Sequence, residues 1–220
     1  MLLAVDTSTT QVGIALYDGA QVIGEFAWRS GQRHTVELAP AVSDLLSRCG
    51  LTMDDVSALG VALGPGSFTS LRVGLALTKG LALAKEIPLI GIRTLDVLAN
   101  AQPASELPLA VAIHAGRSRF ALGWYKNLKG TWQAQGEARI VTIAEINAEV
   151  KSPSILCGEF SVEERQEIKN ENIQLASPAD SVRRPAILAE LAWARWQADD
   201  TDDAASLAPI YLHTDGTSSI

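Results

Sequence analysis

The sequence predicts an α/β protein with two lobes, each built on a mixed sheet flanked by helices. Short apolar runs bounded by turn residues alternate with longer segments of helical spacing, which is the pattern of a sheet with helical cover. Both halves of the 220-residue chain also open with strands and close with helices, on either side of a Pro- and Ser-containing connector at 102–108. We therefore expect an N-terminal lobe at 1–103, joined by the C-terminal segment 204–220, and a second lobe at 104–203.

The chain begins with three strands, a buried run at 2–5 followed by 12–17 and 21–28. Asp18-Gly19 supplies the tight turn that joins the last two strands as a hairpin. A helix follows, because five apolar residues fall on one stripe and Gly50 suits its C-terminal end. These residues are Leu38, Val42, Leu45, Leu46 and Cys49.

A glycine-rich turn dominates the rest of the first half. Thr52 and Asp55 have the spacing of a capping box, which predicts a short helix. A buried strand at 58–63 then enters Gly64-Pro65-Gly66-Ser67, and a long helix is expected at 68–84. A strand at 88–92 and a helix capped by Thr94 complete this half.

The second half restarts with strands at 109–113 and 119–125 and a turn near Gly130. Helix, strand, helix, strand and helix are then expected at 142–150, 155–157, 162–169, 173–175 and 185–197. The acidic run 199–203 is expected to be a solvated loop. The basic pair Arg183-Arg184 is expected to lie at the surface.

Composition narrows the function classes. The net charge is −7, whereas a protein that grips phosphate backbones by itself usually has a basic face. Cys49 and Cys157 have no disulfide or metal-clip spacing, and the histidines (His34, His114 and His213) form no metal-binding pair. We expect reduced thiols, no metal site and no cofactor. No apolar run approaches the roughly 20 residues of a membrane span, so a cytoplasmic location is expected.

Two segments could carry nucleotide chemistry. The turn Gly64–Ser67 places backbone N–H groups at a helix N-terminus, a natural anion site, but it lacks the named phosphate-binding fingerprints. Asp6, Thr7 and Ser8 follow the first strand, where actin-like ATPases and sugar kinases place the acid that orients magnesium. The alternatives are a tight strand-to-helix connection and a polar loop that satisfies local backbone groups. Together these residues favour the actin-like fold more strongly than they favour ATP turnover, and they define a vestigial nucleotide site of Asp6, Thr7, Gly64, Pro65, Gly66 and Ser67.

Five segments together resemble the TsaB (YeaZ) family. They are A-V-D-T-S-T at 4–9, H-T-V-E-L-A-P at 34–40, G-P-G-S-F-T-S-L-R-V-G at 64–74, P-L-I-G-I-R-T-L-D at 88–96 and A-P-I-Y-L at 208–212. The resemblance is strong over the first 100 residues or so, and the G-P-G-S-F-T run is its most specific part. His114-Ala115-Gly116-Arg117 departs from the family, whose members often carry Asp-Ala-Arg at that place.

The resemblance implies an actin-like (ASKHA, ribonuclease H-like) fold and a non-catalytic role. TsaB looks like a degenerate relative of TsaD, whose metal-binding His-x-x-x-His would lie at 92–98, where this chain has no histidine. The implied function is to pair with the catalytic TsaD subunit and, through it, with the ATPase TsaE. That complex forms threonylcarbamoyladenosine next to the anticodon of tRNA. The chain is expected to contact tRNA only indirectly and to form a homodimer when alone.

The expected docking surface is helical. Its residues are Leu38, Val42, Phe68, Leu71, Arg72, Leu75 and Thr78, and Gly74 beside them permits close backbone approach. The alternative is that these side chains face the core of the chain itself. Two other functions stay open, a small ATP-dependent phosphotransferase that uses Asp6 with the Gly64–Ser67 turn and, more weakly, a glycoprotease-type peptidase.

Overall fold

The computed structural model describes residues 1–31, 33–116 and 118–212. The chain divides into two compact units. Unit 1 contains Met1–Val97 and Arg183–Ile210, and unit 2 contains Leu98–Val182 with the described residues after Ile210. No helix within the described part of the chain is long and apolar enough to cross a membrane.

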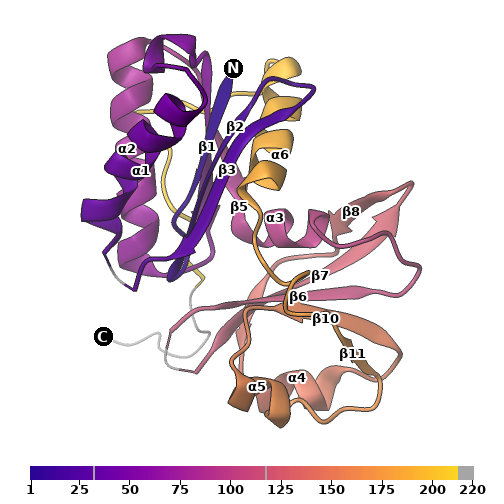
Figure 1. The fold of residues 1–220 in the computed structure, drawn as a ribbon. Helices are drawn as coiled ribbons and strands as arrows, with labels where there is room; N and C mark the ends of the chain where they lie inside the picture. The colour runs from indigo at the N-terminus through magenta and orange to yellow at the C-terminus, as the bar shows by residue number, and fades with distance from the viewer. Residues whose placement is uncertain (32, 117, 213–220) are drawn as a thin grey trace. The chain divides into compact units, whose positions relative to one another are not determined.

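Unit 1 is built on a five-stranded sheet with the order β3-β2-β1-β4-β5 (Figure 1). Strands β1 (Leu2–Asp6), β2 (Gln11–Tyr17) and β3 (Val22–Arg29) form an antiparallel meander. Strands β4 (Ala58–Gly64) and β5 (Leu89–Arg93) continue the sheet from β1 in parallel. Because β1 and β4 are parallel neighbours, Asp6 and Gly64, at the carboxyl ends of these strands, lie at the same end of the sheet.

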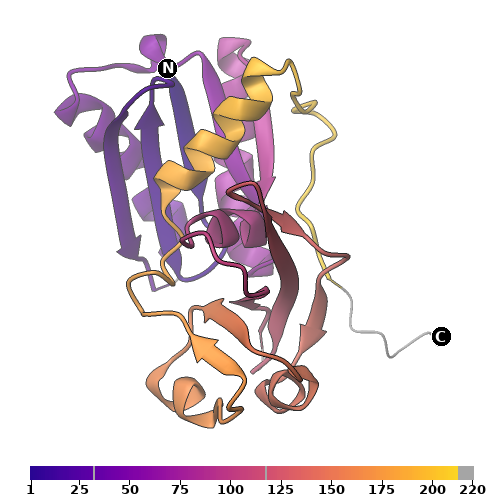
Figure 2. The ribbon, with the colours of Figure 1, turned by 90° about the vertical axis from the view of Figure 1, so that its right-hand side faces the viewer.

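Helices cover both faces of this sheet, and the two-residue period of the strands sets which side chain each face receives. In β1, Leu3 and Val5 pack with α1 (His34–Arg48) and α2 (Phe68–Lys85). Leu2 and Ala4 pack on the opposite face with α6 (Pro185–Gln197), which Figure 2 shows lying across the strands. The connections contain the short 3-10 helix Met53–Asp55, whose Thr52–Asp55 capping box is present, and α3 (Thr94–Asn100).

Helix α6 belongs to unit 1, whereas the sequence placed residues 185–197 in the second lobe. Its buried side chains, Leu188, Ala189 and Ala192, cover the face of the sheet that α1 and α2 leave open. The approach is close, since a Cβ atom at Gly60 would lie 2.8 Å from the Cβ atom of Ala192. The sequence boundary was wrong because an apolar helix stripe does not show which of two sheets it covers.

The chain after α6 remains on unit 1 as far as Ile210. Asp202 pairs with the edge strand β5, where its amide donates to Leu89 O at 2.9 Å. Farther along, Leu207 and Ile210 pack on the core, and the Ile210 amide donates to Leu63 O at 2.8 Å. Of the segment expected to rejoin the first lobe, residues 204–220, only 204–212 are among the described residues.

Unit 2 repeats the strand order of unit 1. Its path is β11-β10-β6-β7-β8, with β9 also paired to β7. As in unit 1, the opening strands are antiparallel and the crossover strands are parallel to the first. The elements are β6 (Leu109–His114), β7 (Phe120–Leu128), β8 (Thr131–Ala134), β9 (Arg139–Val141), α4 (Ile143–Glu149), β10 (Ser154–Gly158), α5 (Val162–Glu167) and β11 (Ile173–Leu175). This shared topology agrees with the two related lobes expected from the sequence.

Candidate functional site

The loop after β1 holds a buried ion pair. The Asp6 carboxylate accepts the Ser8 amide at 2.7 Å through Oδ1 and the Arg183 Nε at 2.8 Å through Oδ2. Nη2 of Arg183 also donates to Thr9 Oγ1 at 2.9 Å and to Gln11 O at 3.0 Å. The Arg183 and Asp6 side chains are 1% and 2% exposed. Arg183, which the sequence placed at the surface, is therefore an internal partner of Asp6, and only its neighbour Arg184 is exposed.

The same loop is tied to α2 and α3 by its hydroxyl groups. Thr7 Oγ1 donates to Ser70 O at 2.7 Å and accepts the Gly74 amide at 3.1 Å. Ser8 Oγ lies 2.8 Å from Thr94 Oγ1, which also accepts the Gly64 amide at 2.9 Å. A Cβ atom at Gly74 would lie 2.4 Å from Thr7 Oγ1, so this glycine permits the close approach of helix and loop.

The glycine-rich turn is closed against the loop. The Ser67 amide donates to Ser8 O at 2.7 Å, and Ser67 Oγ accepts the Ser70 amide at the start of α2. A Cβ atom at Gly66 would lie 2.3 Å from Ser8 O. Gly64 and Pro65 are buried. The six residues predicted to form a vestigial nucleotide site are thus brought together, and the hydrogen bonds of Asp6, Thr7 and Ser67 go to the chain itself.

These residues do not fit the magnesium–nucleotide that the actin-like fold binds in its enzymes. The oxygens of the Asp6 carboxylate already accept bonds from Ser8 and Arg183, and the side chain has almost no exposed surface. The Ser67 amide, at the start of α2 where a phosphate would bind, already donates its hydrogen bond to Ser8 O. The polar-loop alternative describes Asp6 and Thr7 better than the nucleotide site does.

The structure divides the seven residues expected at the docking surface. Five of them, Leu38, Val42, Leu71, Leu75 and Thr78, are buried in unit 1. Thr78 Oγ1 donates to Gly74 O at 3.0 Å, inside its own helix. Phe68 is 52% exposed, and the guanidinium of the exposed Arg72 lies 3.6 Å from its ring centroid.

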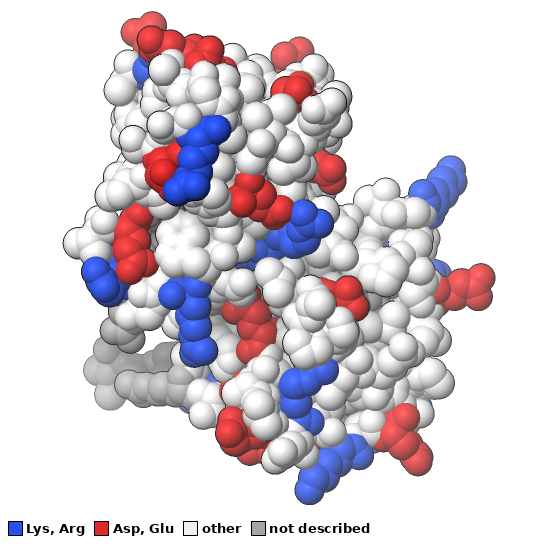
Figure 3. Space-filling view, in the orientation of Figure 1, with Lys and Arg blue, Asp and Glu red and all other residues white. Residues whose placement is uncertain are grey.

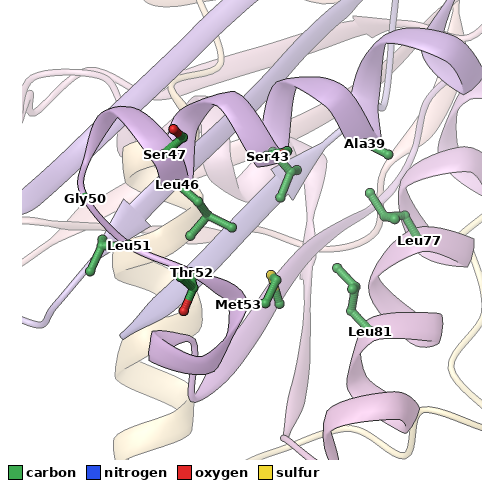
Figure 4. Close-up of a pocket in the computed structure, with 11 residues that line it drawn as sticks. Ala39, Ser43, Leu46, Ser47, Gly50, Leu51, Thr52, Met53, Leu77 and Leu81 are labelled. Carbon is green, nitrogen blue, oxygen red and sulfur yellow. The ribbon is translucent and has the colours of Figure 1, made fainter.

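An open, largely apolar groove runs between α1 and α2. Its volume is about 630 Å³, and Figure 4 shows Leu77 and Leu81 of α2 pointing across it toward α1 and Met53. The α1 side presents Ala39, Ser43 and Ser47, which are exposed and spaced four residues apart. The remaining lining residues are Val42, Leu46, Gly50, Leu51 and Thr52.

Sequence reasoning missed most of this groove for a physical reason. Helix α2 is apolar on nearly every side, so its pattern does not separate the core face from an outer apolar face. Leu77 and Leu81 are half-buried and lie one turn apart, beside the buried Leu75 and Thr78. The available signal was the run of small residues Ala39, Ser43 and Ser47, which leaves a shallow strip along α1.

The helices that form the groove also carry paired charges. On α1, Arg48 Nε lies 2.8 Å from the Asp44 carboxylate, and Lys85 at the end of α2 pairs with Asp54. In the view of Figure 3, the described basic side chains lie singly among acidic ones and do not form a broad basic surface.

Of the other candidate residues, His34 and Cys49 lie in unit 1, where His34 Nε2 lies 2.9 Å from Thr9 O, and the rest lie in unit 2 or outside the described chain. His114 Nε2 lies 3.3 Å from the Glu164 carboxylate, and the His114 ring packs on Phe120. Burial raises the pKa of the Cys157 thiol to about 12. Arg117 and His213 lie outside the described residues.

The strand order, the helices on both faces of the first sheet and the repeated topology define a two-lobed protein of the actin-like class. The YeaZ structure from Pseudomonas aeruginosa matches with a TM-score of 0.81 at 24% identity, over 96% of this chain and 99% of that one. EutJ, an ethanolamine utilization protein from Carboxydothermus hydrogenoformans, matches with a TM-score of 0.50 at 13% identity, over 86% and 88% of the two chains. These similarities concern the fold.

Sequence comparisons identify the family. The model of the TsaD family, described as tRNA N6-adenosine threonylcarbamoyltransferase, matches residues 27–177. The tRNA threonylcarbamoyladenosine biosynthesis protein TsaB of Bacillus subtilis is 30% identical over 96% of this chain and 93% of its own length. TsaB of Escherichia coli is 39% identical over 45% of this chain, and that match spans 42% of the E. coli protein. The chain belongs to the TsaB family.

Proposed function

We propose that the chain is the non-catalytic subunit that binds a TsaD-type catalytic subunit in the synthesis of tRNA threonylcarbamoyladenosine. The groove between α1 and α2 is the observation that carries this proposal. It joins apolar side chains from both helices to a strip of small residues on α1. Such a surface accepts the apolar face of a partner helix, because small residues let the helices approach and Leu77 and Leu81 supply contact area.

The partner is assigned by family. The matching model is that of TsaD, so the catalytic subunit and this chain are expected to share an actin-like unit with helices in corresponding places. A TsaD-type subunit would then present two helices to α1 and α2, and the same face would hold two copies of this chain together when the partner is absent. Val36, seven residues before Ser43 on α1 and 61% exposed, extends the strip of small residues toward the start of the helix, and Phe68 at the start of α2 is 52% exposed.

The non-catalytic role is supported by the closed loop at Asp6. A phosphotransferase of this fold needs a carboxylate that is free to orient a metal–nucleotide, and Asp6 is engaged by Arg183 and Ser8. The geometry gives the phosphotransferase alternative no support. The TsaE ATPase would join through the catalytic subunit, and the net charge of −7 favours indirect contact with tRNA, in the cytoplasm.

Co-expression with the TsaD subunit of the source organism tests the partner directly. The two chains should elute as one complex in size exclusion chromatography, and this chain alone should elute as a dimer. Two separate peaks from the co-expressed pair would contradict the proposal.

Depletion of the protein tests the pathway. Nucleoside analysis of bulk tRNA after depletion should show a loss of threonylcarbamoyladenosine, restored by the wild-type chain. An unchanged nucleoside content would contradict a role in its synthesis, whatever the chain binds.

A further inference from the structure

Arg183 reaches the loop after β1 from a distant part of the sequence. It is the first residue of unit 1 after the chain leaves unit 2, and it stands two positions before α6. Its guanidinium contacts the loop at the Asp6 carboxylate, the Thr9 hydroxyl and the Gln11 carbonyl. A single planar cation therefore bonds both the end of β1 and the start of β2.

The chemistry of these contacts is that of a bound cation. The oxygens that surround the guanidinium are a carboxylate, a hydroxyl and a backbone carbonyl, which are the hard oxygen ligands that magnesium and calcium take in proteins. A buried carboxylate needs a compensating charge, because transfer of an unpaired ion out of water is very costly. Arg183 supplies that charge permanently, since an arginine stays protonated in proteins.

We propose that Arg183 is an internal counter-cation that takes the place of the magnesium–nucleotide beside Asp6 and keeps this loop closed. The inference deepens the proposed function, because it gives the physical reason why a subunit of this fold carries no nucleotide chemistry. It assigns that absence to the Arg183 cation, which lies beside the Asp6 carboxylate. The remaining loop contacts, from Ser67 and Gly74, then lock the closed arrangement.

The proposal has a direct chemical consequence. When the guanidinium is removed, Asp6 keeps its carboxylate and its neighbouring oxygens but loses its counter-charge. A divalent cation from solution should then replace it. R183A opens space beside Asp6, R183Q keeps a polar side chain of similar length without the charge, and R183K keeps the charge.

The test uses Mn²⁺ as the probe, with the full chain. Binding is read from the loss of the free-ion signal in electron paramagnetic resonance, and thermal unfolding is followed at rising Mn²⁺ concentrations. R183A and R183Q should bind Mn²⁺ and show a melting temperature that rises with the ion. The wild type, R183K and the double variant D6N/R183A should show neither response.

Several results would overturn the proposal. One is a response to Mn²⁺ in R183A that persists in D6N/R183A, because the ion would then bind elsewhere. Another is the absence of Mn²⁺ binding in both R183A and R183Q; if R183A does not fold, R183Q alone decides. Stabilisation of the wild type by magnesium–ADP would also contradict it. Co-purification of the wild type with its TsaD-type partner is measured in parallel, and failure there counts against the proposed function and leaves the result on Arg183 intact.

Discussion

At the scale of single residues, Arg183 engages the Asp6 carboxylate that was expected to orient a metal–nucleotide. A carboxylate at the end of the first strand predicts a metal–nucleotide site in this fold, and no local pattern indicates that its partner is an arginine 177 positions away. Removing one member of a buried pair usually costs about 3–5 kcal/mol, because the other charge is left buried and unpaired. The pair is therefore a structural requirement of the closed loop.

Gly66 and Gly80 should respond in opposite ways to substitution by alanine, because a Cβ atom has no room at Gly66 and open space at Gly80. Gly66→Ala places a Cβ atom 2.3 Å from the backbone oxygen of Ser8, so the loop must shift. We expect a loss of roughly 1–3 kcal/mol in the free energy of unfolding. Gly80→Ala, at an exposed position of α2 with no atom within 4 Å, should gain about 0.5–1 kcal/mol.

Denaturant unfolding of the isolated chain measures both changes. A Gly66→Ala variant as stable as the wild type would show that the turn and the Asp6 loop are not packed as described. A destabilising Gly80→Ala would show instead that this side of α2 is covered.

The two cysteines differ in burial, which predicts different reactivity. The thiolate is the reactive form, and burial raises the pKa of Cys157 to about 12, whereas Cys49 is partly exposed. In the folded chain at neutral pH, a thiol reagent should label Cys49 and leave Cys157 unmodified until the protein unfolds. Mass spectrometry of labelled peptides assigns the site, and C49S serves as the control. Fast labelling of Cys157 in folded C49S would contradict its burial.

At the scale of elements, the starts of α4 and α5 in unit 2 are stabilised by capping boxes, whose residue spacing can be read in the sequence. Thr142 and Glu145 form a capping box at α4, with the Glu145 amide bonded to Thr142 Oγ1 and the carboxylate bonded to the Thr142 amide. The Thr142 amide and hydroxyl lower the pKa of Glu145 below its usual value of 4.5, because they bond to the ionised form. The cap is therefore pH-dependent.

Substitutions at this cap should change stability in a predictable direction with pH. T142A should cost about 1 kcal/mol at neutral pH. Glu145 contributes its stabilisation above the usual carboxyl pKa and loses it as the pH falls through its lowered folded value. Urea unfolding should show E145Q destabilised at neutral pH and equal to the wild type in acid. The exposed Glu137 provides the control substitution E137Q, and an E145Q effect that persists in acid would contradict the charge mechanism.

The elements that the sequence predicted well are those with local signals. The hairpin turn at Asp18-Gly19 and the capping box at Thr52 follow from short patterns, and both halves were correctly read as strand-first units. The errors concern long-range placement. The sequence could not show that α6 crosses back to the first sheet, that Arg183 is buried against Asp6, or that Leu38 and Leu71 face the core, because each depends on a contact between distant segments.

At the scale of the whole molecule, the two units share one strand order. Unit 1 buries the Asp6–Arg183 ion pair and leaves the groove between α1 and α2 open at its surface. The chain thus combines a closed loop at Asp6 with an exposed apolar groove. That combination favours a protein that works by binding a partner.

The exposed face can be tested by a substitution that leaves the core untouched. Ala39 is exposed on α1 within the groove, so A39R would place a long charged side chain where a partner helix must approach. We expect the affinity for the TsaD-type subunit to fall about tenfold or more, which corresponds to roughly 1.4 kcal/mol.

The matched control is A194R, which changes an exposed alanine in α6 on the opposite side of the same sheet. Calorimetric titration of each variant with the partner measures the difference, with circular dichroism to verify folding. Equal affinity for A39R and A194R would move the docking surface away from α1, whereas a loss confined to A39R would place the partner on the groove.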